Sequence, residues 1–412
     1  MLDINFIENN IDAVKENCRR RRCPVDVEAL LALEKERVAL MVKHDAVRAC
    51  LNEMARSFKD VPASEEDRRK VRELKDEIAG LPDAIEQLQR KRDEHLALIP
   101  NMLDPRAPVG GDEAAVVLRE VGEKPRFSFT PLSHDELGEK LNIIDIKRGV
   151  SVARARFYVL KNEAVLLRMA LVRMFLSLVE GQGWELVSPP VLVKNRTLFT
   201  SGYLPFSKKD NFRIEGDDLS LIGTSEQALV GMHQDEILSS LPILYLGDSM
   251  CFRTEAGNYG RDTKGIIRVH QFFKLEQFVF CHPDESEKWH LQCLSNEEKL
   301  MQELGIPYRV VLMNSDDMAA PGALKYDTEA WLPSQNRYLE MTSNTNIRDY
   351  QCRRGQIRFK IDGKKGFPHT ISATGFCDRL IVSLLEIYQQ SDGTIQIPEK
   401  LRPFMNGLDR IA

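Results

Sequence analysis

Charged and aromatic side chains alternate between residues 268 and 276, at Arg268, His270, Phe272, Lys274 and Glu276. Alternate residues of a β-strand lie on the same face, so this run predicts a strand with one charged and aromatic face. A strand exposed to solvent can carry such a face. An aromatic ring among fixed charges is better suited to a nucleotide pocket, because the ring can stack on a base while guanidinium groups bind phosphate.

A second β-prone run, 251–256, precedes this one, and the segment between the two contains Gly257, Gly260 and Gly265. Two such runs joined by a glycine-containing segment predict a β-hairpin with a long loop. The chain has no GxxxxGK[ST] phosphate loop and no GxGxxG fingerprint. Short strands follow one another without a regular βαβ rhythm. We therefore expect an α+β domain with a mainly antiparallel sheet flanked by helices.

The composition is typical of a globular protein of a reducing compartment. The chain has 412 residues, of which 43% are hydrophobic, enough for two or three domains with buried cores. Its eight cysteines form no CxxC pair, which argues against a zinc ribbon or a dense disulfide framework and favours reduced thiols. The sequence shows no targeting leader and no run near the ~20 apolar residues of a membrane span, so we expect a cytosolic protein without membrane contact.

The net charge of −5 argues against a protein that coats nucleic acid, because non-specific binding needs many phosphate-neutralising side chains. Any contact with RNA must therefore be local. The densest basic cluster is the run of four arginines at 19–22. A solvated helix end explains this cluster about as well as an RNA contact does.

The segment 27–98 predicts an antiparallel helical hairpin, which should form a coiled coil. Apolar residues repeat in it every seven positions, at Leu33, Leu40, Val47 and Met54 and then at Val71, Ile78, Ile85 and Leu74, Leu81, Leu88. Pro62 disfavours helix between the two series, and Ser64 followed by Asp67 resembles a helix start. Each helix of ~30 residues would be about 45 Å long, too long for a compact domain to cover. We expect Pro82 to kink or break the second helix.

The hairpin could be a spacer or a dimerisation element, or an arm that binds RNA, and its mixed charges do not decide between them. Residues 99–111 read IPNMLDPRAPVGG, a Pro/Gly-rich linker. We therefore predict an N-terminal domain over 1–110, made of the hairpin and the linker, and a second domain over 111–412.

The two runs of the predicted β-hairpin resemble motif 2 of the class II aminoacyl-tRNA synthetases. The segment EAGNYGRDTKGIIRVHQFFKLEQF resembles the version of this motif found in seryl-tRNA synthetases. The resemblance implies that Arg253 binds the α-phosphate of ATP and the reacting carboxylate. It also implies that Thr254 and Glu255 contact the adenylate and that Phe272 stacks on adenine.

Three further residues of this motif have implied contacts. Val269 would contact ATP through its backbone. Arg261 and Lys264, in the loop, would meet the acceptor end of a tRNA, although a solvated loop explains these two charges nearly as well.

Two other segments resemble motifs 1 and 3 of the same class. Residues 187–192 are similar to motif 1, with Pro190 in the proline position of the dimer interface. Residues 371–379 resemble motif 3, a strand leading into a helix, and imply that Arg379 binds the γ-phosphate. Here the sequence departs from the family, because SATGFCDR is one residue shorter than the common NGSGLAVGR or NNTALATPR and places Asp378 beside the arginine.

The residues implied for the amino-acid pocket are Thr224, Ser225, Glu226, Glu276 and Thr374, with Arg253 at its edge. The first three stand where the family has Thr-Ala-Glu, Glu276 is the glutamate of its Lys-Val-Glu, and Thr374 matches the Ser or Thr that completes the pocket. Carboxylates and a hydroxyl suit an ammonium group and a small alcohol. A site that hydrogen-bonds a hydroxyl can reject glycine and alanine by about 10⁴ in favourable cases, because losing that partner leaves polar groups unpaired.

The segment Glu340, Met341, Thr342, Ser343 resembles the family's Glu-Ile-Ser-Ser. The resemblance implies that these four residues contact ATP, and that Glu340 and Ser343 hold a divalent metal that bridges its phosphates. Mg²⁺ is favoured because both ligands are hard oxygens. An ordinary strand end is the alternative interpretation.

As a whole, the resemblance implies a cytosolic homodimer that uses ATP and Mg²⁺ to convert L-serine to seryl-adenylate and transfers serine to tRNA(Ser), with tRNA(Sec) a further family substrate. The helical hairpin would bind the long variable arm of that tRNA. One alternative is a paralogue that activates an amino acid for a carrier protein, against which the complete hairpin argues. Another is a non-catalytic RNA-binding regulator, against which the retained Arg253, Glu276 and Arg379 argue. The altered motif 3 leaves both alternatives open.

Overall fold

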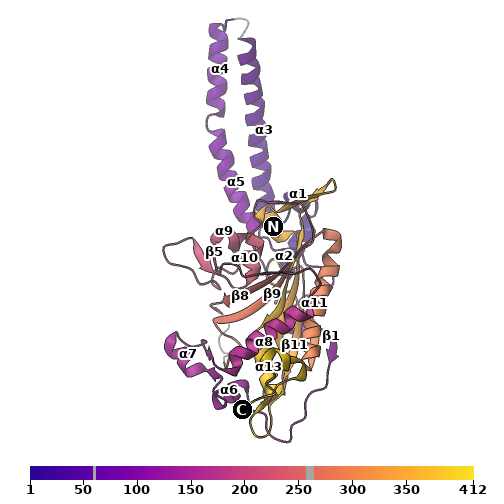
Figure 1. The fold of residues 1–412 in the computed structure, drawn as a ribbon. Helices are drawn as coiled ribbons and strands as arrows, with labels where there is room; N and C mark the ends of the chain where they lie inside the picture. The colour runs from indigo at the N-terminus through magenta and orange to yellow at the C-terminus, as the bar shows by residue number, and fades with distance from the viewer. Residues whose placement is uncertain (59–61, 257–263) are drawn as a thin grey trace. The chain divides into compact units, whose positions relative to one another are not determined.

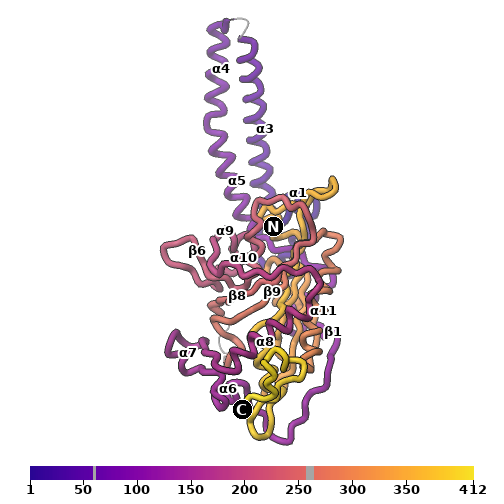
Figure 2. The backbone as a smooth tube through the Cα atoms, in the orientation of Figure 1, coloured from indigo at the N-terminus to yellow at the C-terminus, as the bar shows by residue number. Residues whose placement is uncertain are grey.

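The computed structural model describes residues 1–58, 62–256 and 264–412. It divides the chain into two compact units, Leu2–Pro100 and Asn101–Ala412, with Met1 grouped with the second (Figure 1; Figure 2). Within the described ranges, no helix combines the length and the apolar character needed to cross a membrane.

The first unit consists of two short helices and a long helical hairpin. Its helices are α1 (Ile4–Asn9), α2 (Ile11–Arg20), α3 (Val27–Ser57), α4 (Glu65–Ile78) and α5 (Leu81–Ala97). α4 and α5 together run back alongside α3 (Figure 1). The predicted antiparallel hairpin is therefore confirmed.

The heptad residues form the contact line between the two arms of the hairpin. Leu40, Val47, Leu74 and Ile78 are half-buried, whereas neighbours such as Lys43 are exposed. Each helix has one neighbour along the hairpin, so its apolar stripe can be covered from one side only. The sequence pattern thus predicted the contact surface of the hairpin as well as its existence.

The predicted start and break of the returning arm are both present. At the start of α4, the Asp67 N–H donates to the Ser64 hydroxyl at 3.1 Å and the Ser64 N–H donates to the Asp67 carboxylate at 3.0 Å, which is a capping box. α4 ends at Ile78, and α5 begins at Leu81 with Pro82 in its first turn. Proline lacks an N–H and tolerates only the start of a helix, so Pro82 separates the two helices.

The second unit is built on an eight-stranded sheet. In spatial order its strands are β1 (Val116–Val121), β10 (Tyr308–Leu312), β11 (Leu324–Leu332), β12 (Arg337–Arg348), β15 (His369–Cys377), β9 (Gln271–Cys281), β8 (Ile243–Phe252) and β4 (Glu185–Val187). Neighbouring strands are antiparallel except for β4 and β8, which are parallel. This confirms the predicted α+β class with a mainly antiparallel sheet.

Helices and small sheets surround this sheet. The helices are α6 (His134–Lys140), α7 (Ile146–Val152), α8 (Glu163–Leu178), α9 (Asn195–Thr200), α10 (Ser225–Gly231), α11 (Ser286–Glu303), α12 (Tyr350–Gly355) and α13 (Arg379–Ile387). The remaining strands are β2 (Ile144–Asp145), β3 (Val159–Leu160), β5 (Leu192–Lys194), β6 (Leu219–Leu221), β7 (Ile237–Leu238), β13 (Arg358–Ile361), β14 (Lys364–Gly366), β16 (Ile395–Gln396) and β17 (Arg410–Ile411).

Strand β9 shows how the sheet separates core from site. Leu275 belongs to the main hydrophobic core, and the side chain of Gln277 reaches α11, where it donates to the Cys293 carbonyl at 3.3 Å. Phe278 and Phe280, on the other face, pack with apolar residues of α10. Glu276 shares the face of Phe278, so the strand period of two directs it away from the main core.

The strand predicted to start at Arg268 starts at Gln271, which is opposite Phe252 in the β8–β9 pair. Arg268 and His270 therefore lie outside the strand, and the predicted alternation is wrong for these two residues. The physical reason is a change of partner, because the His270 N–H donates to the carbonyl oxygen of Arg156 at 3.0 Å. The alternation of Phe272, Lys274 and Glu276 falls inside β9.

The predicted linker makes specific contacts from Asn101 onward. The Asn101 side-chain amide donates to the carbonyl oxygens of Pro321 at 2.8 Å and Ile347 at 2.7 Å, and the carboxylate of Asp104 pairs with Arg348 at 2.8 Å. These residues belong to the second unit, so the division at Pro100 falls within the predicted linker.

Candidate active site

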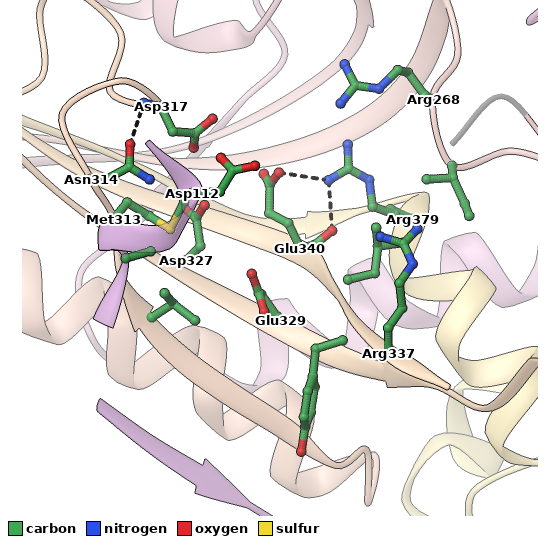
Figure 3. A pocket seen from close by; sticks show the side chains of 15 residues that line it. Asp112, Arg268, Met313, Asn314, Asp317, Asp327, Glu329, Arg337, Glu340 and Arg379 are labelled. Atoms are coloured by element: carbon green, nitrogen blue, oxygen red, sulfur yellow. Dashed lines mark hydrogen bonds and ion pairs between the residues drawn. The ribbon is translucent and has the colours of Figure 1, made fainter. Parts of the chain in front are cut away.

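A polar cleft of about 490 Å³ lies in the second unit. Its lining includes Arg253, Glu276, Glu340 and Arg379, which come from four separate parts of the sequence. An adjoining cavity of about 310 Å³ shares Arg268, Glu340 and Arg379 with the cleft (Figure 3). The motifs predicted to form a site are therefore brought together around one hollow.

Two guanidinium groups line the cleft. Arg253 follows β8, where its Nε donates to the Gly223 carbonyl at 3.1 Å and its Cζ lies 5.3 Å from the centroid of the Phe272 ring. Arg379, the first residue of α13, donates to the Glu340 carbonyl at 2.8 Å and pairs with the Glu340 carboxylate at 3.3 Å (Figure 3). Two guanidinium groups that line one cleft can bind the phosphates of a nucleotide, and Phe272, beside Arg253, is packed against the main core.

The charge of Glu340 is set by its neighbours. Burial alone would raise the pKa of this carboxyl group, but the cations Arg379, Lys325 and Arg253 lower it to about 2. Glu340 is therefore ionised at neutral pH, and its side chain is 43% exposed toward the cleft. An ionised, accessible carboxylate can act as a hard oxygen ligand.

A bulge brings Glu340 and Ser343 to the same cavity. Residues three apart on a regular strand point to opposite faces. In β12 the pairing with β11 skips Met341, because Thr328 is opposite Thr342 and Glu329 is opposite Glu340. The extra residue restores a common face, so both Glu340 and Ser343 line the cleft. Met341 packs instead in the main core.

The oxygen donors here fit a magnesium ion that also binds phosphate. Asp327 is opposite Ser343, and its Oδ1 has no hydrogen-bond partner in the described part of the chain. In that same part, no three His, Cys, Asp or Glu side chains gather closely enough to hold a metal alone. Mg²⁺ commonly takes one or two carboxylates and completes its shell with water and substrate phosphates, so Glu340 and Ser343 are a sufficient protein contribution.

Buried polar groups also line the cleft. Glu276 is ion-paired with Lys274, and its Oε2 accepts from the Thr224 hydroxyl at 3.1 Å. Glu226, in the first turn of α10, accepts from the Gln351 amide at 2.6 Å. Burial, and then the charge of Glu276, raise the pKa of Glu226 to about 7.

Ser372 connects these two carboxyl groups. Its hydroxyl lies 2.9 Å from Oε2 of Glu226 and 2.7 Å from Oε1 of Glu276. A hydroxyl has one proton and can fully donate to only one carboxylate. The second short contact is satisfied when Glu226 is protonated and donates to Ser372, which agrees with the raised pKa of Glu226. With Glu226 protonated, which is favoured below a pH of about 7, Ser372 donates to Glu276 and accepts from Glu226.

The remaining residues predicted for the amino-acid pocket differ in their placement. Thr374 is opposite Glu276 on β15, and its hydroxyl accepts from the Ser343 N–H at 3.4 Å. Ser225 is fully buried and donates to the Gly247 carbonyl of β8 at 3.3 Å, so its hydroxyl is used within the fold.

Of the remaining residues predicted to contact ATP, one lines the cleft and two use their hydroxyl groups within the fold. Glu255 lines the cleft and accepts from Arg268 at 2.7 Å. The Thr254 hydroxyl donates to the Lys209 carbonyl at 2.6 Å. The Thr342 hydroxyl donates to the buried Glu297 of α11 at 2.6 Å, on the helix side of the sheet.

Val269 is buried in the main core. Of the two predicted tRNA contacts, Arg261 lies outside the described residues. The Lys264 ammonium lies 3.3 Å from the Ser133 hydroxyl and 3.5 Å from the Asp135 carboxylate.

Sequence reasoning did not assign a role in the amino-acid pocket to Ser372, Lys274 or Gln351. The signal for Lys274 was available, because it shares the strand face of Phe272 and Glu276. Ser372 and Thr374 likewise alternate on one strand, so the prediction of Thr374 could have included Ser372. Gln351 reaches the pocket from α12, and no sequence pattern connects that helix to β9.

Comparison with known proteins places the chain in a class and then in a family. The model of the tRNA synthetase class II core domain (G, H, P, S and T) matches residues 209–388, and the model of the seryl-tRNA synthetase N-terminal domain matches residues 1–103. The fold is therefore that of a class II aminoacyl-tRNA synthetase.

Full-length relatives identify the family. Serine–tRNA ligases of Rubrobacter xylanophilus and Thermobifida fusca are 41% and 40% identical to this chain, covering 98% of it and 98% and 97% of their own lengths. A crystal structure of the Pyrococcus horikoshii seryl-tRNA synthetase complexed with ATP matches with a TM-score of 0.93 at 36% identity, over 100% of this chain and 99% of the other. The chain belongs to the seryl-tRNA synthetase family.

Proposed function

We propose that this protein activates L-serine with ATP to give seryl-adenylate and transfers the seryl group to tRNA(Ser). The observation that carries the proposal is that one cleft gathers the guanidinium groups of Arg253 and Arg379 together with the buried carboxyls of Glu226 and Glu276 and the hydroxyl of Ser372. An amino acid bound in this cleft would have its carboxylate beside Arg253 and its amino group beside Glu276.

In the activation step, the serine carboxylate attacks the α-phosphorus of ATP in line and pyrophosphate leaves. Arg253 stabilises the charge that develops at the α-phosphate, Arg379 holds the γ-phosphate, and Phe272 stacks on adenine. A divalent metal such as Mg²⁺, held by Glu340 and Ser343, would supply charge neutralisation between the phosphates. The protein contributes mainly position and electrostatic stabilisation, so no protein nucleophile is required.

Serine is selected by pairing both of its polar groups. Its ammonium group would be received by the carboxyls of Glu226 and Glu276, and its hydroxyl would bond within the set formed by Thr224, Glu276 and Ser372. Glycine and alanine would leave these buried groups unpaired, which penalises them strongly without a separate editing site.

In the transfer step, the terminal ribose hydroxyl of the tRNA attacks the seryl carbonyl and AMP leaves. The hairpin of α3, α4 and α5 would bind the long variable arm of the tRNA, and Lys264 would meet its acceptor end. Substrate-assisted proton transfer is sufficient for this step, so we assign no general base. Charging of tRNA(Sec) is a further proposal, which an assay with that tRNA would decide.

We also propose that the protein acts as a homodimer in the cytosol. Leu166 and Met169 on α8 and Leu186 on β4 are exposed apolar residues, and a second copy would cover them. A monomeric mass by sedimentation equilibrium would contradict the dimer. The eight free cysteines suit a reducing compartment, which cell fractionation would test.

Serine-dependent exchange of pyrophosphate into ATP tests the proposed activation step. We expect exchange with serine and less than about a thousandth of that kcat/KM with alanine or glycine. The variant Arg253→Ala should lose exchange while it keeps the circular dichroism of the parent protein. Equal exchange with alanine, or full exchange by a folded Arg253→Ala variant, would refute the assigned site.

A further inference from the structure

Asp378 stands where motif 3 of this chain departs from the common family patterns, which end in Gly-Arg or Pro-Arg. It is 1% exposed and immediately precedes Arg379. Although it occupies the N-cap position of α13, its side chain does not cap that helix. The carboxylate therefore has another role.

The Asp378 carboxylate accepts four hydrogen bonds from three parts of the fold. Arg168 of α8 donates through Nε at 2.6 Å to Oδ1 and through Nη2 at 2.7 Å to Oδ2. The Tyr158 hydroxyl donates to Oδ2 at 2.6 Å, and the backbone N–H of Phe273 in β9 donates to the same oxygen at 2.8 Å. A buried carboxylate with a bidentate guanidinium and two further donors is held in one orientation.

This arrangement connects Arg379 to the strand that carries Phe272. The backbone N–H of Asp378 donates to the Phe273 carbonyl at 3.2 Å, so Asp378 and Phe273 are joined by two hydrogen bonds. Phe272 and Arg379 are each the chain neighbour of one member of that pair. The position of Arg379 relative to β9 and Phe272 therefore depends on Asp378.

We propose that Asp378 is a positioning residue that sets where Arg379 enters the cleft, in place of the residue missing from this shortened motif 3. The proposal rests on the proposed function, in which Arg379 holds the γ-phosphate of ATP. Asp378 does not touch the substrate and acts through Arg379 alone. Its loss should therefore weaken the binding of ATP, whereas the binding of AMP, which has no γ-phosphate, should be kept.

The experiment is titration calorimetry of ATP and AMP binding to the full chain and its variants. We expect Asp378→Asn to raise the Kd for ATP by about tenfold and to change the Kd for AMP by less than about twofold. In an Arg379→Ala background, Asp378→Asn should add less than about twofold to the Kd for ATP, because the residue through which it acts is gone. Asp409→Asn, at an exposed aspartate, is the matched control and should change neither constant.

Tyr158→Phe keeps the test decisive if Asp378→Asn does not fold. It removes the hydroxyl that donates to Asp378 and leaves the ion pair of Asp378 with Arg168. It should raise the Kd for ATP by about threefold and leave that for AMP unchanged. Equal weakening of ATP and AMP, an unchanged Kd for ATP, or a full additional effect in the Arg379→Ala background would overturn the proposal. If the variants weaken the binding of ATP but not of AMP, and the parent protein shows no serine-dependent exchange, the proposed function is refuted. The positioning role of Asp378 then still stands.

Discussion

The two carboxyl groups of the proposed amino-acid pocket differ in their partners, although both belong to glutamates. Glu276 is ion-paired with Lys274, whereas burial and the charge of Glu276 raise the pKa of Glu226 to about 7. Serine brings an ammonium group, which is attracted by the ionised form of Glu226 and not by its protonated form. With serine bound as proposed, its binding is thus coupled to the loss of the proton from Glu226.

We predict that this coupling appears in the pH profile. Below a pH of about 7, kcat/KM for serine in pyrophosphate exchange should fall by about tenfold per unit, because the ionised fraction of Glu226 falls by that factor, and above it the profile should level off. Glu226→Gln should lower kcat/KM and abolish this step. A step that persists in Glu226→Gln would assign the titration to another group.

A second prediction concerns Glu276. Glu276→Gln keeps the size of the side chain but removes the charge that pairs with Lys274 and the serine ammonium. We expect the KM for serine to rise by about 10² and the KM for ATP to change by less than about threefold, as measured by exchange kinetics. Glu180→Ala, at an exposed glutamate, is the control. If only the KM for ATP moved, the assigned role of Glu276 would be wrong.

Thermal unfolding of Glu276→Gln checks its fold independently of its kinetics. The substitution leaves the buried ammonium of Lys274 without its carboxylate, so the variant should be less stable than the parent protein. Kinetics must therefore be measured well below its Tm.

At the level of single residues, the sequence predicted most reliably those side chains whose position follows from strand alternation. Phe272, Lys274 and Glu276 share a face in β9 as expected, but Arg268 and His270 precede the strand. Gln351 could not be found, because its contact with Glu226 depends on how α12 packs in three dimensions.

At the scale of elements, two bulges shape the cleft. The pairing of β12 with β11 skips Met341, and that of β15 with β9 skips Gly375. Each bulge changes which later residues face the cleft, and this is why Glu340 and Ser343 both line it. A bulge depends on the partner strand, so a pattern read along one strand cannot predict it.

The helical hairpin was predictable because its pattern is local. Heptad spacing, the Ser64 cap and Pro82 act within a few residues, and all three have the predicted effect. Its role stays a proposal, since a contact line between two helices does not reveal what the outer faces bind.

Deletion of the hairpin tests that role. α3 and α5 are joined near their base by an ion pair of Glu34 with Arg92 at 3.5 Å, so residues 35–91 can be replaced by a short glycine-containing turn. The cut spares the buried Leu30 and Leu96. We expect serine-dependent exchange to persist and kcat/KM for charging tRNA(Ser) to fall by about 10² or more, equivalent to roughly 3 kcal/mol.

The control for this deletion is the exchange assay itself, which reports on the second unit alone. If the shortened protein charged tRNA(Ser) with unchanged kcat/KM, the hairpin would be a spacer or a dimerisation element.

At the scale of the whole molecule, the chain combines two compact units, to which the proposed function gives different tasks. The second unit holds the described site, and the family model of its core lies within it. The first unit has its own family match over residues 1–103. A paralogue that serves a carrier protein would need to activate an amino acid but would not need to bind tRNA. Transfer to tRNA is therefore the step that distinguishes the proposed function from that alternative.

The most direct measurement is therefore charging of tRNA by the full chain. Radiolabelled serine, ATP and Mg²⁺ are incubated with purified tRNA(Ser), and the esterified amino acid is released and identified by chromatography. We predict serine on tRNA(Ser), with no label transferred when threonine or alanine replaces serine or when a tRNA without a long variable arm is used. Serine-dependent pyrophosphate exchange without any seryl-tRNA(Ser) would contradict the account.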